Sequence, residues 1–481
     1  MLAPLMISAL LLITLLPLGS AVAHQFVPPE IVAKIPPRED APFRTTTTLA
    51  EQGRHIFETE RFGGNGRTCA TCHPRSNNFT LDPAFIKRLS NYDPLFVFER
   101  VPALNGLENG KLLRSKALIL ENLDGFDQPG TMRSVMHLFA LGLSTNPVPG
   151  FPLTHALGWS GDGSPGDGSL RSFTVGAIVQ HMPKTLARVE GTDFRMPTAQ
   201  ELDALEAFQL SLGRRADLVL DPAIAGHLTF SDTNVTVGQT LFAGMPSRQG
   251  TRRCSGCHTG AGGLNDLNQN EQRATGVDRQ ANAPACLDPT APGDGGFLAE
   301  PAVTVDRSTF CGPGKVGPVT FRGNLFFSTQ SIIEAADTGP FFHDNSAATL
   351  EQVIDHYRSD AFNNSVTGAG NGFLISDDQR NQIAAFLRAV NTLDNIRAAT
   401  TSIRAALRPR SNILKAMADA RNDVDDAIGV LSEQSPIRIY QTTALPALKN
   451  AKRLLFLSST LRAAKAELER ARLSILALPP V

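Results

Sequence analysis

Two short motifs that combine cysteine with histidine are the residues of this sequence best suited to chemistry. They read Cys69-Ala70-Thr71-Cys72-His73 and Cys254-Ser255-Gly256-Cys257-His258. This spacing is typical of c-type haem attachment, in which two thiols bond to porphyrin vinyl groups and the adjacent histidine binds the iron. A zinc site and a redox dithiol are alternatives, but neither needs a histidine after the second cysteine. The motifs therefore predict two covalently bound haem c groups, with His73 and His258 as proximal ligands.

The segments around the two motifs repeat. Gly53 and Gly238 stand at the same distance before the first cysteine of their respective motifs. Downstream of each motif, a segment of helical periodicity begins with a capping-type sequence, at Thr198 and at Ser376. An opening helix, a haem motif, long loops and a closing helix thus occur twice, which indicates an internal duplication.

The duplication predicts a mainly α fold with two tandem domains of the class I cytochrome c type. We place the first domain at residues 45–235 and the second at residues 236–395. Sustained alternation of apolar and polar residues is scarce, so few strands are expected. The glycine-rich and proline-rich stretches 161–168 and 281–317 are predicted to be ordered loops and not sheet.

The C-terminal segment has a different composition. After about Thr392 glycine nearly disappears, and Ala, Leu, Arg and Glu dominate. Apolar residues follow heptad spacing over 454–478 and, before the break at Ser435-Pro436, over 417–431. We predict a C-terminal helical bundle at residues 396–481 that packs on itself or on the haem domains. Association into a homodimer and docking of a partner are the alternatives for these helices.

The overall charge gives no sign of an anionic partner. The formal net charge is −1 over 481 residues, so the sequence indicates no basic face for nucleic acid or for an anionic membrane. The hydrophobic content of 42% is high enough for the chain to bury cores. We therefore expect a globular protein that does not bind nucleic acid.

The N-terminal segment predicts export. Residues 1–23 contain no charged side chain, and their long Leu/Ile stretch ends at Pro17. Ala21-Val22-Ala23 has the small-x-small form that signal peptidase accepts. We expect a signal peptide cleaved after Ala23 and a periplasmic protein. An uncleaved membrane anchor is the alternative, which the short apolar run disfavours.

Two cysteines remain once the haem motifs are accounted for. The chain has six cysteines, and the motifs use four of them. Cys286 and Cys311 both lie in the loop-rich part of the second domain. In an oxidising compartment two remaining cysteines most simply pair, so we predict a disulfide between them.

Two further stretches make the chain resemble the bacterial di-haem cytochrome c peroxidase superfamily, which includes MauG-type maturation enzymes. Residues 339–351, Gly-Pro-Phe-Phe-His-Asp-Asn-Ser-Ala-Ala-Thr-Leu-Glu, are similar to the family's PYFHDGS-x-x-TLEE stretch. Residues 158–163, Gly-Trp-Ser-Gly-Asp-Gly, are similar to its FWDGRA stretch with an insertion. The resemblance covers residues 45–395 and leaves out the C-terminal helices.

The resemblance implies reduction of hydrogen peroxide to water in the periplasm. Electrons from a small cytochrome c or a cupredoxin would enter at the haem on His258, pass near Trp159 and reach the haem on His73. A MauG-like oxidase of a protein or organic substrate is a second implied function. Some relatives also hold calcium between the two domains. His343 and Asp344 are expected to brace the second haem pocket.

The resemblance also implies the sixth ligand of the second haem. In the family this ligand stands seven residues beyond the Leu of TLEE, as Met in the usual peroxidases and as Tyr in MauG-like members. Here the position is Tyr357, seven residues after Leu350, and the nearest methionines in sequence are Met245 and Met417. A phenolate lowers the potential of ferric iron, whereas a thioether raises it. A core tyrosine, or His356 as the ligand, remains an alternative.

The first haem is the one at which the resemblance places peroxide cleavage. That step needs a group that moves a proton between the two peroxide oxygens. The family often has a glutamate for this role in a GPI…EM stretch, but the corresponding residues 176–182 lack it and carry His181. His181 as an acid/base, as a sixth ligand and as a structural residue all remain open, and His137 and His155 are weaker candidates. The missing glutamate favours a third function, non-catalytic electron transfer.

Overall fold

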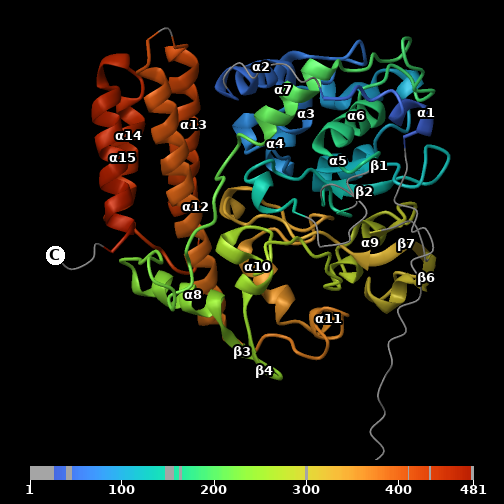
Figure 1. Cartoon of the computed structure of the whole chain (residues 1–481). Coiled ribbons are helices and arrows are strands. Elements are labelled where there is room, and N and C mark those ends of the chain that lie inside the picture. The colour runs from blue at the N-terminus through green and yellow to red at the C-terminus, as the bar shows by residue number, and fades with distance from the viewer. Residues whose placement is uncertain are drawn as a thin grey trace, which may run out of the picture.

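The computed structural model describes residues 27–38, 46–146, 156–161, 165–297, 302–409, 411–432 and 435–477. The expected signal segment, its cleavage after Ala23 and the candidate His155 lie outside these ranges. The described chain is mainly helical, as predicted, and its sheets are small (Figure 1). None of the helices in these ranges has both the length and the apolar character that a membrane span requires.

The first haem motif lies in a helical unit that contains one β-hairpin. In this hairpin β1 (Leu118–Glu121) pairs antiparallel with β2 (Thr131–Ser134). Short 3-10 turns at Arg75–Asn77, Pro94–Glu99, Pro102–Leu104 and Leu141–Leu143 join its helices. The helices are α1 (Pro29–Val32), α2 (Thr46–Thr59), α3 (Cys69–Cys72), α4 (Pro83–Arg88), α5 (Gly110–Lys116), α6 (Leu170–His181) and α7 (Ala199–Gln209).

The second haem motif lies in a unit with longer loops and more strands. Its helices are α8 (Thr233–Ala243), α9 (Pro284–Leu287), α10 (Leu350–Tyr357), α11 (Asp360–Asn363) and α12 (Asp377–Ala406). Its 3-10 turns span Cys254–Gly256, Thr259–Ala261, Val277–Arg279, Arg307–Thr309 and Ala335–Asp337. Its strands are β3 (Met245–Ser247), β4 (Gly250–Arg252), β5 (Gly293–Gly296), β6 (Ala302–Asp306) and β7 (Pro318–Phe326).

The stretch 281–317 was predicted to contain no sheet, and that prediction was wrong. β5 and β6 both fall within it and pair with β7, in the order β5-β7-β6. β6 follows the two-residue period of a strand, since its side chains alternate between exposed and partly buried positions. β5 is Gly-Asp-Gly-Gly, so it has almost no side-chain pattern from which a strand could be recognised.

The opening and closing helices of each unit cross at a glycine. A Cβ atom added at Gly53 of α2 would fall 1.8 Å from the carbonyl oxygen of Ala204 in α7. A Cβ added at Gly238 of α8 would fall 2.0 Å from the carbonyl oxygen of Gln382 in α12. Only glycine lets two helix backbones approach this closely. The equal spacing of these glycines from the haem motifs thus has the same structural cause in both units.

The closing helices match in two further details. Both begin with the expected capping box. At α7, Thr198 and Glu201 exchange hydrogen bonds between side chain and backbone, and at α12, Ser376 and Gln379 do the same. At each crossing a phenylalanine one turn beyond the glycine packs on a phenylalanine of the closing helix. The ring centroids are 5.2 Å apart for Phe57 and Phe208, and 5.3 Å apart for Phe242 and Phe386. The two units therefore pack their opening and closing helices in the same way, in agreement with the duplication inferred from the sequence.

The C-terminal helices form a bundle around α12. α12 packs against α13 (Ile413–Ser432) and α15 (Leu461–Ile475), and α14 (Ala444–Leu454) packs against α13 and α15, as Figure 1 shows. The expected boundary at residue 395 falls inside α12, which is one continuous helix. One hydrophobic core runs through the second unit and the bundle, whereas the first unit has a separate core. The bundle thus extends the second unit.

The heptad pattern over 454–478 does not belong to a single helix. α14 ends at Leu454 and α15 begins at Leu461, with a 3-10 turn at Ser458–Thr460 between them. The Thr460 hydroxyl donates a hydrogen bond to the carbonyl oxygen of Leu454, which satisfies the end of α14 and favours the break. Leu457, expected in the bundle core, is consequently exposed.

Ion pairs join the bundle to the first unit. The Arg54 guanidinium of α2 donates to Asp419 of α13 at 2.9 Å, and Arg75, two residues after His73, contacts Asp419 at 3.0 Å. Arg75 also contacts Asp423 at 3.2 Å. The bundle therefore contacts both haem-motif units, by continuity with the second and by charge with the first.

Candidate functional site

The first haem motif lines a cavity of about 160 Å³ in the first unit. Its two cysteines occupy the single turn of α3, which starts at a capping box between Thr68 and Thr71. This turn brings the thiols of Cys69 and Cys72 and the imidazole of His73 to the same cavity wall. Three of the groups that c-type haem requires are thus assembled by one helical turn.

The second motif lines a larger cavity of about 250 Å³ in the second unit. Because the two motifs line separate cavities, their four thiols do not converge on one ion, which argues against the zinc alternative. Three guanidinium groups, those of Arg252, Arg253 and Arg273, also line the second cavity. Cations at this wall suit the two carboxylates of a porphyrin. The rest of the wall is mostly apolar, as haem requires.

The two motif histidines are held in the same way. Nδ1 of His73 donates to the carbonyl oxygen of Phe79 at 2.8 Å, and Nδ1 of His258 donates to that of Gly262 at 3.0 Å. Since the proton is on Nδ1, the lone pair is on Nε2, which is the nitrogen that binds a metal. Burial lowers the pKa of His73 to about 4 and also lowers that of His258, so both rings are neutral. Both sites therefore fit a haem iron.

Tyr357 lines the cavity of the second motif, where the resemblance places it. It is the last residue of α10 and lies among Phe342, Phe362 and Phe373. Burial and the neighbouring cysteines raise the pKa of its phenol. Its hydroxyl has no hydrogen-bond partner within the described part of the chain. The structure thus places the phenol in the cavity wall, and its role as an iron ligand stays a prediction.

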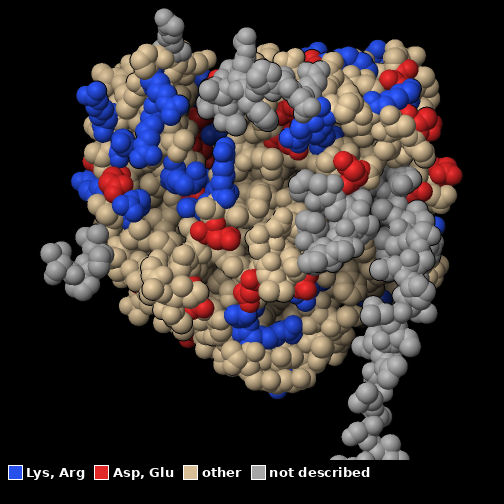
Figure 2. All heavy atoms as spheres, in the orientation of Figure 1, with Lys and Arg blue, Asp and Glu red and all other residues tan. Residues whose placement is uncertain are grey.

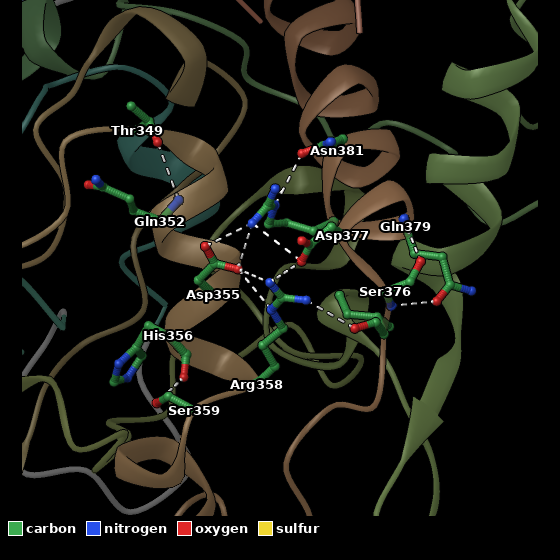
Figure 3. Close-up of polar contacts among 12 residues, drawn as sticks. Thr349, Gln352, Asp355, His356, Arg358, Ser359, Ser376, Asp377, Gln379 and Asn381 are labelled. Atoms are coloured by element: carbon green, nitrogen blue, oxygen red, sulfur yellow. Dashed lines mark hydrogen bonds and ion pairs between the residues drawn. The ribbon is translucent and has the colours of Figure 1, made fainter. Parts of the chain in front are cut away.

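A polar network fixes the end of α10 that carries Tyr357 (Figure 3). The Arg358 guanidinium donates to Asp355 at 2.8 Å and reaches Asp377 at the start of α12. Arg380 of α12 donates back to Asp355 at 3.1 Å. Because these pairs connect α10 to the capped end of α12, the position of Tyr357 depends on the helix that closes the second unit.

His356 does not compete with Tyr357 for the cavity. Its Nε2 lies 2.9 Å from the carbonyl oxygen of Thr275, and its Nδ1 lies 3.2 Å from the amide nitrogen of Gln280. Both ring nitrogens are thus occupied by protein groups, and the side chain does not line the cavity. The structure therefore disfavours His356 as a ligand.

A methionine that sequence reasoning missed does lie near the haem motifs. Met136 lines both cavities, although it is far from either motif in the sequence. Distance along the chain singled out Met245 and Met417 instead, and neither of them lines the second cavity. Met136 is thus a thioether in the walls of both sites, and no local sequence signal marks it.

His181 lines the first cavity, at the end of α6. Its Nδ1 is buried without a hydrogen-bond partner and lies 3.8 Å from Oε1 of Glu108. Glu108 accepts hydrogen bonds at 2.8 Å from Arg67 and from the backbone N–H of Leu120. Burial alone would raise the pKa of Glu108, but Arg67 and His181 bring it below its ordinary value. An ionised carboxylate therefore stands beside the imidazole.

Glu108 was not predicted as a site residue. Its partners Arg67 and His181 stand far from it in the sequence, so no spacing rule could connect them. Arg67 and Glu108 are almost fully buried, with side-chain exposures of 1% and 0%. A buried ion pair beside an unpartnered imidazole is the second feature, after the haem motif, that distinguishes the first cavity.

Trp159 belongs to the walls of both cavities. Its indole N–H donates to the carbonyl oxygen of Ser134 at 2.9 Å. Ser134, Val135 and Met136 line both cavities as well, so the end of β2 and the two residues after it separate the cavities together with the indole. The only tryptophan of the chain thus lies between the two candidate haem sites.

Two further histidines, His137 and His343, have structural positions. His137 lines the second cavity and not the first, and its two ring nitrogens contact the carbonyl oxygen of Ser331 and the N–H of Phe139. His343 also lines the second cavity and stacks on Phe327, with ring centroids 3.8 Å apart. These contacts agree with a bracing role for His343 and leave His137 without a free nitrogen.

The two other cysteines are joined to each other. Cys286 and Cys311 form a disulfide with their Cα atoms 5.3 Å apart, outside both cavities. Among the residues in the described ranges, no group of three or more His, Cys, Asp and Glu side chains could hold a metal ion. The calcium ion that the resemblance implies therefore stays a prediction.

Comparison with known proteins gives distant structural neighbours only. No known protein-family model matches the sequence, and no curated protein matches it. A MauG-like protein associated with microbial copper homeostasis aligns over 73% of this chain and 91% of its own, with 17% identity and a TM-score of 0.36. Hydrazine synthase of Kuenenia stuttgartiensis, pressurised with xenon, aligns over 80% and 99%, with 17% identity and a TM-score of 0.37. Similarity this low assigns no function.

Proposed function

We propose that the protein is an exported di-haem c-type oxidoreductase that reduces hydrogen peroxide in the periplasm. Two electrons from a small cytochrome c or a cupredoxin, two protons and one peroxide would give two molecules of water. The electrons would enter at the second unit and be used at the first. The observation that carries the proposal is Trp159 in the walls of both cavities, because an aromatic ring there shortens the gap between the two cofactors.

The side chains of the two motifs would hold the cofactors. Bound haem supplies iron that accepts and releases electrons, and the protein sets its ligands and its access. The protein residues that would hold the two groups are Cys69, Cys72, His73, Cys254, Cys257, His258 and Tyr357. The first cavity also contains His181, whose Nδ1 has no hydrogen-bond partner among the described residues.

His181 is proposed to move the proton that peroxide cleavage requires. Its unpartnered Nδ1 can accept a proton from one peroxide oxygen and donate it to the other, which then leaves as water. Glu108 would stabilise the protonated imidazole, since Arg67 keeps the carboxylate ionised. The pair would thus replace the glutamate that the family often has and this sequence lacks.

Peroxide turnover by the haem-loaded protein tests this role. His181→Gln is expected to lower kcat/KM for peroxide by roughly 10²–10⁴-fold, as the loss of an acid/base group does. Glu99→Gln is a matched control, because Glu99 is an acidic residue paired with Arg114 on the surface. The absorption spectrum of each variant checks that both haem groups are bound. A His181→Gln protein within threefold of the unmodified rate would contradict the assignment.

The path of the electrons needs a separate test. In stopped-flow mixing with reduced donor, Trp159→Phe is expected to leave reduction of the second haem unchanged and to slow electron arrival at the first. His181→Gln is the control, because it should affect peroxide turnover and not electron arrival. Equal transfer rates in Trp159→Phe and in the unmodified protein would remove the main support of the proposal.

A MauG-like oxidase is the second candidate, and Tyr357 is the observation that favours it. As a phenolate ligand, Tyr357 would stabilise high oxidation states of a bound iron, which oxidation of a protein or organic substrate requires. Peroxide consumption that proceeds without oxidation of a cytochrome donor would favour this function. Electron exchange without any peroxide consumption would instead favour a non-catalytic electron-transfer protein.

A further inference from the structure

The charge of the chain is unevenly distributed. Residues 396–481 contain 14 Lys and Arg against seven Asp and Glu, a formal charge of +7 within a chain of −1. The rest of the chain therefore carries −8. The whole-chain charge gave no indication of a basic face because the two parts cancel.

The acidic side chains of the bundle leave its outer surface basic. Asp419 and Asp423 face the first unit, where they bind Arg54 and Arg75. Asp425, Glu467 and Glu469 each pair with a basic residue of the bundle itself. Figure 2 shows the result, with Lys and Arg side chains gathered over the region of α13, α14 and α15.

One end of the bundle exposes large apolar side chains. Figure 1 places the α12–α13 and α14–α15 connections at the same end. Leu414, Phe456 and Leu457 are 79%, 63% and 62% exposed. With Leu407 and Ile413, which are also exposed, they form what we call the bundle tip.

Exposed basic residues lie close in sequence to the residues of the bundle tip. Arg421 donates to the carbonyl oxygen of Leu455 at 3.0 Å and lies 5.3 Å from the centre of the Phe456 ring, so α13 and the α14–α15 connection are in contact. Arg408, Arg453 and Arg462 are exposed beside the tip, and none of them forms an ion pair with a described residue. Apolar side chains ringed by such cations are typical of proteins that lie on an anionic bilayer.

We propose that the bundle tip docks on a bilayer that contains anionic phospholipid. The apolar side chains would enter the headgroup region, and the arginines would bind lipid phosphates. A second copy of this chain is a poor occupant, because a symmetric contact would bring two surfaces of the same positive charge together. The negative remainder of the molecule would face away from the membrane. This inference does not depend on the proposed peroxidase activity.

Vesicle sedimentation of the haem-loaded protein tests the proposal. The protein is expected to bind vesicles of phosphatidylcholine mixed with phosphatidylglycerol at low salt, and to bind pure phosphatidylcholine far less. Each arginine near an anionic surface changes binding by about fivefold, so Arg408→Gln/Arg453→Gln/Arg462→Gln should bind about 100-fold more weakly. Phe456→Ser/Leu457→Ser should also weaken binding, because it removes the apolar contact.

The control variant is Leu267→Ser/Val316→Ser, which removes two residues that are 73% and 72% exposed elsewhere. It should bind vesicles as the unmodified protein does. The proposal is overturned if phosphatidylglycerol does not increase binding, or if both tip variants bind normally. It is also overturned if light scattering shows a dimer that the tip variants dissociate, because a second copy would then be the occupant.

Discussion

Replacing glycine with alanine is expected to destabilise the protein at the two helix crossings and to stabilise it at an exposed helix position. Gly53→Ala would place a Cβ atom 1.8 Å from a backbone oxygen, and Gly238→Ala would place one at 2.0 Å. Real Cβ contacts do not fall below 3.0 Å, so the helices must separate by about 1 Å. A change of side-chain rotamer cannot relieve a contact with backbone. We therefore expect each variant to lower the free energy of unfolding by about 3 kcal/mol, the upper end of the cost of overpacking.

A third glycine supplies the control. Gly429 is an exposed residue of α13, and an added Cβ would meet nothing within 4 Å. Alanine loses less backbone entropy than glycine in a helix, so Gly429→Ala should stabilise the protein by about 0.5–1 kcal/mol. The intrinsic helix propensity changes in the same direction at all three sites. If the stability change has opposite signs at the crossings and at Gly429, the difference must come from the close helix contacts at the crossings.

Guanidinium unfolding of the haem-loaded proteins, followed by circular dichroism at 222 nm and by haem absorption, gives the measurement. Gly53→Ala should destabilise the first unit, and Gly238→Ala should destabilise the second unit together with the bundle, because these two share one core. The reasoning is refuted if Gly53→Ala or Gly238→Ala is as stable as the unmodified protein, or if Gly429→Ala is destabilised equally.

Three further predictions concern single sites. Tyr357→Phe should change the absorption spectrum of one haem, whereas His356→Gln should not, because the His356 nitrogens are bound by protein groups; identical spectra for all three proteins would contradict the ligand assignment. Burial raises the pKa of Asp278 to about 6, above its ordinary 3.8. Ionisation of this carboxyl group therefore lowers the free energy of unfolding by about 3 kcal/mol as the pH rises from 4 to 6, and it has no further effect above pH 6. Urea unfolding across this range should show that Asp278→Asn reduces the pH-dependent loss by about this amount, and an unchanged dependence on pH would refute the prediction. Cys286→Ala/Cys311→Ala should lower the free energy of unfolding by roughly 3–4 kcal/mol, because it opens a loop of 25 residues; an unchanged thermal midpoint would contradict this.

The features that the sequence predicted are those with a local signal. The capping boxes at Thr198 and Ser376 consist of residues three positions apart, so a short pattern was enough to find them. The glycine before each motif could be found because its spacing from the motif is the same in both halves of one chain. Tyr357 was located by its offset from a motif, and the structure places it in the wall of the second cavity.

The features that the sequence did not predict depend on distant contacts or on a misread signal. Glu108 reaches His181, and Met136 reaches the cavity walls, only through tertiary folding, so nothing near them in the sequence marks a site. The boundary at residue 395 was placed at a change in composition. No glycine or proline interrupts residues 377–406, and only such a breaker would have ended the helix there.

The unbroken course of α12 has a consequence for access to the second cavity. Its 30 residues form a rod of about 45 Å that contributes Ile383 and Leu387 to the cavity wall and ends next to Leu407. A rigid rod allows no hinge between these two places. If the bundle tip docks as proposed, the surface beneath it would set the height and the tilt of the second cavity, so a partner would approach that cavity from a fixed direction.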